Sequence, residues 1–310
     1  MAMRTVLFWT LAVVVTVSSG IYQRRTGPTY PLSGMTELGG QSIAYSLPRS
    51  HGGDGDQEIR IATGSVPATG TLEWKRHKTN DPWAAVDMKQ ENGALVAMLP
   101  HQPPAGKLDY KVTLRSGETT VQLPVEGGVV IRFRGDVPAA VLITHVAVMF
   151  LSMLFSVRAG LELWGTGKNL KKMMYVTLVL MGIGGLILGP IVQKYAFDAY
   201  WTGWPFGHDM TDNKTLVAFL AWGVAVAMFH RGKHAARWAF GAAVVTLIVF
   251  LIPHSVLGSE LNYEEMDKAA KPAGAALTLP ARIDRPGQGI DGHTALRPGT
   301  ASEVFASATA

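Results

Sequence analysis

Side chains that bind metals, cofactors or hydrogen-bond donors are concentrated in one short loop between two long apolar segments. The loop covers residues 195–215 and contains His208, three aspartates and the pair Trp204-Pro205. Imidazole nitrogens bind haem iron, carboxylates accept hydrogen bonds, and aromatic rings stack against flat groups. A loop that only reversed the chain would not need these side chains, and binding groups concentrate on loops held by rigid elements. We therefore expect a binding site at this loop.

Two further histidines are expected at the same level of the membrane as this loop. His145 lies about 10 Å inside an apolar segment at roughly 1.5 Å per residue, and His254 follows another apolar segment directly. Ionisable groups inside a membrane are costly and are functional candidates by default. Two interpretations of His145 stay open: a neutral imidazole hydrogen-bonded to a neighbouring helix, or a contact to haem, a chlorophyll-type pigment or a quinone. In the second interpretation, His145, His208 and His254 are the candidate cofactor-binding residues.

Other polar and aromatic residues are candidates for binding a partner protein. They share the expected outer face and are Trp201, Trp204, Phe206, Asp209, Glu260 and Tyr263. The two tryptophans also fit the aromatic belt at a membrane–water interface. The acidic residues lack the spacing of a calcium-binding loop, so no metal site is predicted. Asp212 or Asn213 directly precedes an apolar helix and is expected to cap it.

Motifs of soluble enzymes are absent from the sequence. There is no cysteine, which excludes disulfides, thiolate metal sites and cysteine nucleophiles. There is also no phosphate-binding loop, nucleotide-binding glycine fingerprint, HExxH motif or serine elbow. The net charge of +5 comes mostly from basic residues at the ends of apolar segments, where membrane topology explains them better than nucleic-acid binding. These absences favour a non-catalytic role and a partner other than nucleic acid.

Five apolar segments are predicted to be membrane helices. They cover residues 5–21, 139–157, 173–192, 216–229 and 238–252. The first is either a signal peptide or a retained anchor, and we favour the anchor. In the third, Gly182, Gly185 and Gly189 repeat at helical spacing, which predicts close helix packing.

The charges of the connecting loops predict the orientation of these helices. The loops around residues 158–172 and 231–237 are basic and should be cytoplasmic, and the N-terminus should lie on the same side. The loop 195–215 carries three aspartates and should face outward. This orientation places the soluble region, the loop and the C-terminal tail in the periplasm of a bacterial inner membrane.

Residues 30–134 have the pattern of short antiparallel strands. Seven runs of alternating apolar and polar residues are separated by turns rich in Gly, Pro, Asn and Asp. With Trp74 in an early strand, Leu99-Pro100 before a turn, and Tyr110 in Leu-Asp-Tyr-Lys-Val, this region resembles fibronectin type III and immunoglobulin-like domains. The resemblance implies a β-sandwich that serves as an interaction or spacer module, with Tyr110 as a buried corner tyrosine.

Four domains follow from these patterns. They are an anchor (1–25), a periplasmic β-sandwich (26–135), a four-helix transmembrane domain (136–256) and an extended periplasmic tail (257–310). The tail after Lys268 is rich in Ala, Gly and Pro and has too little apolar surface to form a core. Scattered apolar residues such as Leu277, Ile290 and Phe305 are expected to lie along a partner, which makes the tail a tether.

The loop 195–215 is expected to pack against residues 253–263, because both segments leave the membrane at the same level. This packing should bury Trp204, Phe206 and at least one of His208 and His254. The segments YWTGWPFGHDMTDNKT and PHSVLGSELNYE also resemble segments of uncharacterised bacterial inner-membrane proteins. That resemblance implies a shared structure on the outer face and assigns no activity.

We expect a non-catalytic accessory subunit of a larger bioenergetic complex of the bacterial inner membrane, photosynthetic or respiratory. Its partners would be other integral membrane subunits and the lipid bilayer, with bound lipid. Two alternatives are a b-type haem or quinone-binding redox protein that uses His145 and His254, and a membrane-anchored sensor. An absorption spectrum would separate the first alternative from a colourless subunit.

Overall fold

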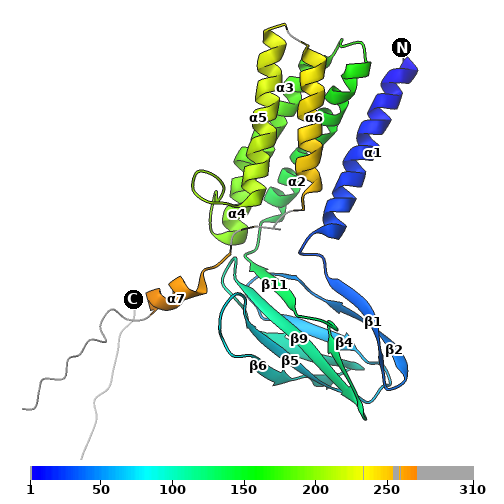
Figure 1. Cartoon of the computed structure of the whole chain (residues 1–310), viewed down its shortest axis with the longest axis vertical. Coiled ribbons are helices and arrows are strands. Elements are labelled where there is room, and N and C mark those ends of the chain that lie inside the picture. The colour runs from blue at the N-terminus through cyan, green and yellow to red at the C-terminus, as the bar shows by residue number, and fades with distance from the viewer. Residues whose placement is uncertain (1, 233, 254–257, 259, 271–310) are drawn as a thin grey trace, which may run out of the picture. The chain divides into compact units, whose positions relative to one another are not determined.

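The structure is a computed structural model, and it describes residues 2–232, 234–253, 258 and 260–270 (Figure 1). Residues Met1–Lys268 form one compact unit. The helices are α1 (Ala2–Thr26), α2 (Ala139–Gly160), α3 (Leu170–Met181), α4 (Gly189–Phe197), α5 (Met210–His230), α6 (Ala235–Leu251) and α7 (Tyr263–Ala270). The strands are β1 (Leu32–Leu38), β2 (Gln41–Leu47), β3 (Ser50–Gly52), β4 (Gln57–Ala62), β5 (Thr69–Arg76), β6 (Ala84–Asp87), β7 (Lys89–Glu91), β8 (Ala94–Leu99), β9 (Lys107–Ser116), β10 (Thr119–Leu123) and β11 (Val129–Arg134). The expected tether lies on residues outside the described part of the chain.

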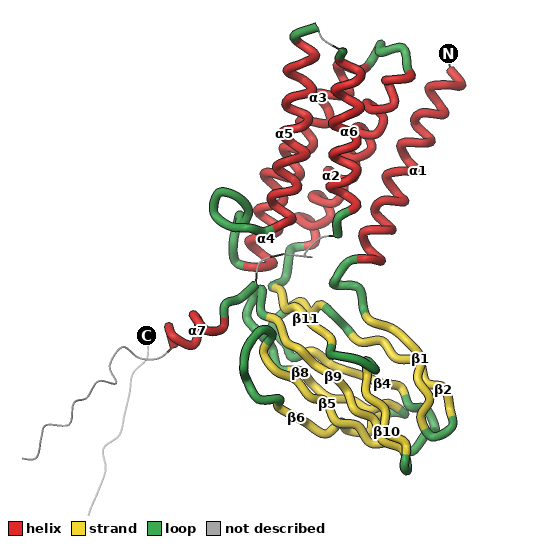
Figure 2. Tube along the Cα trace, in the orientation of Figure 1, coloured by secondary structure: helices red, strands yellow, loops and turns green. Residues whose placement is uncertain are grey.

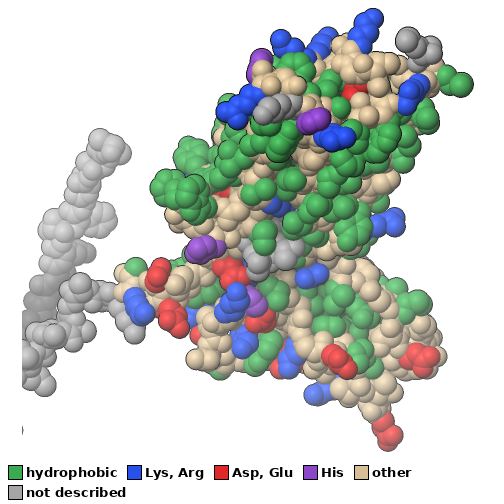
Figure 3. Space-filling model, turned by 45° about the horizontal axis from the view of Figure 1, so that its top comes forward, with side chains coloured by type: hydrophobic (Ala, Val, Ile, Leu, Met, Phe, Trp, Pro, Cys, Tyr) green, Lys and Arg blue, Asp and Glu red, His purple; other side chains and the backbone are tan. Residues whose placement is uncertain are grey.

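All five predicted apolar segments are helical, and four of the helices are long and apolar enough to cross a membrane. These four cover Met3–Thr26, Ala139–Trp164, Leu170–Phe197 and Met210–His230, while Ala235–Leu251 is shorter. On the face shown in Figure 3, hydrophobic side chains extend along the helices, and several Lys and Arg side chains lie at one end of them. The chain therefore combines helices that are apolar enough to cross a membrane with a β region, as the sequence predicts (Figure 2).

Small residues and one buried hydrogen-bonded pair hold α2, α5 and α6 together. Gly160 of α2 lies so close to α6 that an added Cβ would come within 2.6 Å of the Ala243 side chain. Trp222 of α5 is fully buried, and its indole N–H donates to the hydroxyl of Thr246 at 2.9 Å. That hydroxyl donates in turn to the carbonyl of Ala242 at 2.8 Å, so every polar atom in this contact has a partner.

The glycines of the third apolar segment pack as predicted, but the segment is not one regular α-helix. An added Cβ at Gly185 would come within 2.5 Å of Thr215 on α5, and one at Gly182 within 3.3 Å of Phe219. Between α3 and α4, residues Gly182–Leu188 form a π-helix. Such wide turns are frequent at functional sites. This one leaves a backbone carbonyl near His145, described below.

The β region has one shared hydrophobic core. One sheet has the strand order β3-β11-β9-β5-β6, with β10 paired to β9, and a second has the order β4-β8-β7. Strand β9 alternates strictly, burying Leu108, Tyr110, Val112 and Leu114, which lie in the same core as residues of β4 and β8. The Tyr110 hydroxyl donates to the carbonyl of Pro48 at 2.8 Å, and burial raises its pKa well above the ordinary value.

All seven predicted strands form, and the described part of the chain contains four more. The additional strands are β1, β3, β6 and β7. Strands β6 and β7 have no buried residue, so they carry no apolar alternation that a sequence pattern could reveal. Strands β1 and β2 pair as a hairpin that is joined to neither of the larger sheets by hydrogen bonds.

Candidate functional site

The first turn of α5 is capped by Asp209. Its carboxylate accepts a hydrogen bond from the backbone N–H of Thr211 at 2.7 Å, and the helix begins at Met210. The expectation that Asp212 or Asn213 caps this helix is wrong, because the helix begins before both residues. Their side chains are consequently available for other contacts.

Asp212 and Asn213 instead hold the backbone of the preceding loop. The carboxylate of Asp212 accepts the N–H groups of Thr202 at 2.7 Å and Gly203 at 2.9 Å. The side-chain oxygen of Asn213 accepts the next one, from Trp204, at 2.6 Å. An added Cβ at Gly203 would come within 2.5 Å of the Asp212 side chain, so only glycine permits this close approach. Three successive backbone donors therefore fix the loop to the helix.

The aromatic side chains of the loop point away from these contacts. Tyr200 is 61% exposed, Trp204 69% and Phe206 83%. Trp201 is half-buried, and its indole N–H donates to the carbonyl of Trp204 at 3.1 Å. The expected burial of Trp204 and Phe206 is wrong, because the backbone of the loop turns inward and the rings turn outward. We call Tyr200, Trp204 and Phe206 the aromatic platform.

His208 is also exposed, and His254 lies outside the described residues. His208 therefore does not point into the helical bundle. Of the three candidate cofactor-binding histidines, His145 alone is placed by the structure inside the helical bundle. What this end of the bundle can bind depends on the residues around His145.

His145 is hydrogen-bonded to the π-helix of the neighbouring segment. Its Nδ1 lies 3.0 Å from the carbonyl oxygen of Gly184. A carbonyl only accepts, so Nδ1 carries the proton and Nε2 of the neutral ring is left as an acceptor. This geometry matches the interpretation of a neutral histidine bonded to a neighbouring helix, and it leaves the cofactor interpretation as a proposal.

A polar cavity of about 130 Å³ lies between His145 and the first turn of α5. Its polar lining comes from four elements and consists of Arg132, His145, Gln193, Asp209, Thr211, Asp212 and Thr215. Gln193 of α4 donates to the hydroxyl of Thr202 at 2.6 Å, which connects this lining to the loop. The backbone N–H of Gly135 donates to the carbonyl of Ala196 at 2.9 Å and ties the end of the β region to α4.

Arg132 brings a positive charge from strand β11 into this lining. It is buried, and its guanidinium lies 3.8 Å from the centre of the Phe197 ring. Burial lowers the pKa of Arg132 to about 10, although the carboxylates of Asp209 and Glu260 act in the opposite direction. Arg132 therefore stays charged at neutral pH, and its stacking on an aromatic face is favourable for a guanidinium.

Lys214 brings a second buried positive charge, and its role is to cap α6. Its ammonium donates to the carbonyl of Ile252 at 2.5 Å and lies 3.5 Å from that of Pro253. Gln23 of α1 donates to the carbonyl of Phe250 at 2.9 Å. Two side chains from other helices thus satisfy the carbonyls at the end of α6, which have no partner within the helix.

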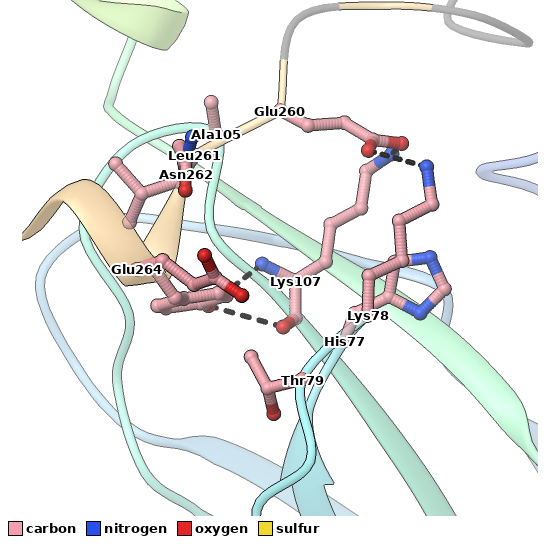
Figure 4. Close-up of a pocket in the computed structure, with 10 residues that line it drawn as sticks. His77, Lys78, Thr79, Ala105, Lys107, Glu260, Leu261, Asn262 and Glu264 are labelled. Atoms are coloured by element: carbon pink, nitrogen blue, oxygen red, sulfur yellow. Dashed lines mark hydrogen bonds and ion pairs between the residues drawn. The ribbon is translucent and has the colours of Figure 1, made fainter.

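A separate groove of about 340 Å³ lies where residues 260–264 contact the β region (Figure 4). The Glu260 carboxylate bridges Lys78 and Lys107, with both N–O distances at 2.6 Å. The Tyr263 hydroxyl accepts the backbone N–H of Lys107 at 3.0 Å and lies 3.0 Å from the side-chain oxygen of Gln102. Burial alone would raise the pKa of Glu260, but the hydrogen bonds from the two lysines outweigh it and lower the pKa to about 2.

Residues 260–267 are therefore an acidic segment bound to a basic surface of the same chain. Arg76 of β5 pairs with Asp267 through two hydrogen bonds of 2.8 Å, and its guanidinium lies 5.0 Å from the centre of the Tyr263 ring. The expected packing of 253–263 on the loop 195–215 is wrong for the described residues 260–263. Their charged and hydroxyl groups contact Lys78, Gln102 and Lys107 of the β region instead.

Most residues of these contacts that the sequence pattern did not indicate carry a cationic or amide side chain. The apolar pattern of a strand or helix indicates its buried face but not the role of a polar residue within it. This applies to Lys107, Arg132 and Gln193. Arg132 did carry one signal, since it is a charged residue in an otherwise apolar strand, Val-Val-Ile-Arg-Phe, and a buried charge in such a strand needs compensating groups.

Comparisons with known proteins assign neither a family nor a function to this chain. No protein-family model, no curated protein and no solved structure matches the chain.

Proposed function

We propose that this protein is a non-catalytic subunit of a larger complex of the bacterial inner membrane, and that the aromatic platform binds a neighbouring integral membrane protein. The observation that carries the proposal is the opposite orientation of backbone and rings in residues 200–206. The backbone is fixed by Asp212 and Asn213, while Trp204 and Phe206 are left exposed. Rigid, exposed aromatic rings are typical anchors of binding interfaces, because they contribute large contact area at little entropic cost.

The rest of the chain fits this role as follows. All five apolar helices span the membrane, with the basic loops in the cytoplasm and the platform in the periplasm. The β region is an immunoglobulin-like or fibronectin type III-like sandwich that acts as a spacer on the periplasmic side. The tail after Lys268 tethers the subunit to its neighbours on the periplasmic side. The class of complex that we propose is bioenergetic, either photosynthetic or respiratory.

The proposal competes with a membrane-anchoring role for the same rings. Tryptophan is enriched at the membrane–water interface even where no partner binds. An anchor in lipid and an anchor in a protein differ in one measurable respect, because only the second changes the mass of the solubilised particle.

The test is a native gel of membranes solubilised in a mild detergent, comparing wild type with Trp204→Ala/Phe206→Ala. We expect wild type to migrate in an assembly of one discrete mass, and the double variant to migrate as the free 33.3 kDa chain in its detergent micelle. The matched control is Trp164→Ala, which removes an exposed tryptophan from the turn after α2. A wild-type chain that migrates alone, or a double variant that stays in the assembly, would contradict the proposal.

A further inference from the structure

Two cavities at the end of the bundle share one wall. His145, Met149 and Thr215 line both the polar cavity described above and a second cavity of about 110 Å³. The rest of the second lining is mostly apolar and comes from α1, α2, α5 and α6, including Val146, Phe150 and Val249. A site that is polar on one side of His145 and apolar on the other suits an amphiphilic ligand.

The apolar cavity leads on to the surface of the bundle. Gly20 and Phe150 line it and also line an open groove beside α1, together with Val17 and Ile21. Val17 and Ile21 are exposed apolar side chains on a helix long enough to cross a membrane. The shared lining residues therefore place the polar cavity, the apolar cavity and this groove next to one another, and the groove faces lipid when α1 spans the bilayer.

The charges around the polar cavity select a neutral ligand. Arg132 lines it and Lys214 lines its apolar neighbour, and the carboxylates of Asp209 and Asp212 oppose these two positive charges. A phosphate would enter against two carboxylates, and an ammonium against two buried cations. The net charge of such a ligand would remain uncompensated in a buried site, and burying an uncompensated charge costs free energy.

The free acceptor of His145 and the volume of the polar cavity limit which neutral ligands can bind. Nε2 of His145 is an acceptor, because Nδ1 donates to Gly184, and no hydrogen-bond partner for Nε2 is found among the described residues. A ligand hydroxyl would complete this site. A cavity of about 150 Å³ accommodates benzene, so the polar cavity has the size of a single six-membered ring.

From these observations we infer that the paired cavities bind the ring of an isoprenoid quinol or quinone. A ring hydroxyl donates to Nε2 of His145, Arg132 faces the opposite side of the polar cavity, and the isoprenoid tail leaves past Phe150 along α1. The inference concerns binding alone and does not depend on the aromatic platform.

Calorimetric titration of the purified full-length chain tests this inference, with decylhydroquinone as the probe, because its ring carries only the two hydroxyls and the decyl chain. We expect saturable binding by wild type and at least tenfold weaker binding by His145→Leu. His230→Leu is the matched control, since His230 ends α5 and contacts Tyr175 instead of either cavity. Val146→Trp gives a second, independent variant. Val146 is partly exposed and lines the apolar cavity, so a larger ring there should block the tail without touching the histidine.

Four results would overturn the inference. These are no saturable binding by wild type, equal affinities of His145→Leu and His230→Leu, an unchanged affinity of Val146→Trp, and a phospholipid that binds with the same dependence on His145 while the quinol does not. Elution of each variant as a single peak in size-exclusion chromatography confirms that lost binding is not lost folding. Because no variant alters the platform, failure here would leave the proposed subunit role unaffected.

Discussion

Replacing Asp212 by Ala should release the loop that carries the aromatic platform, while the helices stay folded. The carboxylate is buried and accepts the N–H groups of Thr202 and Gly203. Alanine removes the carboxylate oxygen that accepts both hydrogen bonds and leaves two donors of the loop without this partner in a place that water reaches poorly. The loss is therefore local to residues 199–208.

The change in the free energy of opening the loop can be worked out from the two hydrogen bonds. Each bond to a charged acceptor contributes about 1.5–3 kcal/mol. Burying the carboxylate has a cost of its own, so we take the lower end and expect the loop to open more easily by about 3 kcal/mol. Since every 1.4 kcal/mol is about a factor of ten, opening becomes roughly a hundredfold more frequent.

Hydrogen–deuterium exchange of the solubilised protein measures this opening directly, because protected amides exchange through local unfolding. The peptide that contains Gly203 and Trp204 should exchange roughly a hundredfold faster in Asp212→Ala, while peptides of α2 and α6 should be unchanged.

The matched control is Asp198→Asn in the same loop. Asp198 is exposed and pairs only with Lys194 at the surface, and asparagine tolerates its left-handed backbone, φ 60°. An Asp212→Ala loop that exchanges no faster than the Asp198→Asn loop would refute the structural role assigned to Asp212.

Two further predictions concern the acidic segment and the membrane orientation. The pKa of Glu260 is lowered from its ordinary 4.5 to about 2, so its contribution to holding the segment is complete above about pH 4.5 and is lost as the pH falls towards 2. Met266→Cys gives the chain a single cysteine for a spin label. With Glu260 intact, the label should become mobile as the pH falls through this range, and with Glu260→Gln it should be mobile already at pH 7. Equal mobility of the label in both chains at pH 7 would count against the bridge between Glu260 and the two lysines. Reporter fusions at Asn169 and Gly232 should be active only as cytoplasmic reporters, and a periplasmic signal from either would reverse the proposed topology.

The elements that bury one face or one stripe were predictable from the sequence. The strict alternation of β9 and the long apolar runs of α2 and α5 are direct consequences of burial or of contact with lipid. Strands β6 and β7 were not predictable, because they are held by backbone pairing with β5 and β8 and bury no side chain. The π-helix after α3 was not predictable either, since its apolar residues fit a regular helix equally well.

The position of the loop 195–215 between two apolar helices was predictable from the sequence, but the orientation of its side chains was not. Aromatic and acidic residues in one loop indicate a binding region, yet they do not reveal whether rings or carboxylates face inward. That choice depends on Asp212 and Asn213, which reach the loop only once α5 has formed. The partners of Glu260 come from Lys78 and Lys107, more than 150 positions away, and no local pattern specifies such a contact.

The most direct test of the subunit role is photo-crosslinking from the aromatic platform in living cells. A photoreactive phenylalanine analogue at position 204 should give one discrete adduct with an integral membrane protein, and the same analogue at position 164 should not give it. The adduct should disappear when Asp212→Ala is added, because the platform is then no longer held in place. Crosslinks to lipid alone, or the same adducts from positions 204 and 164, would contradict the account.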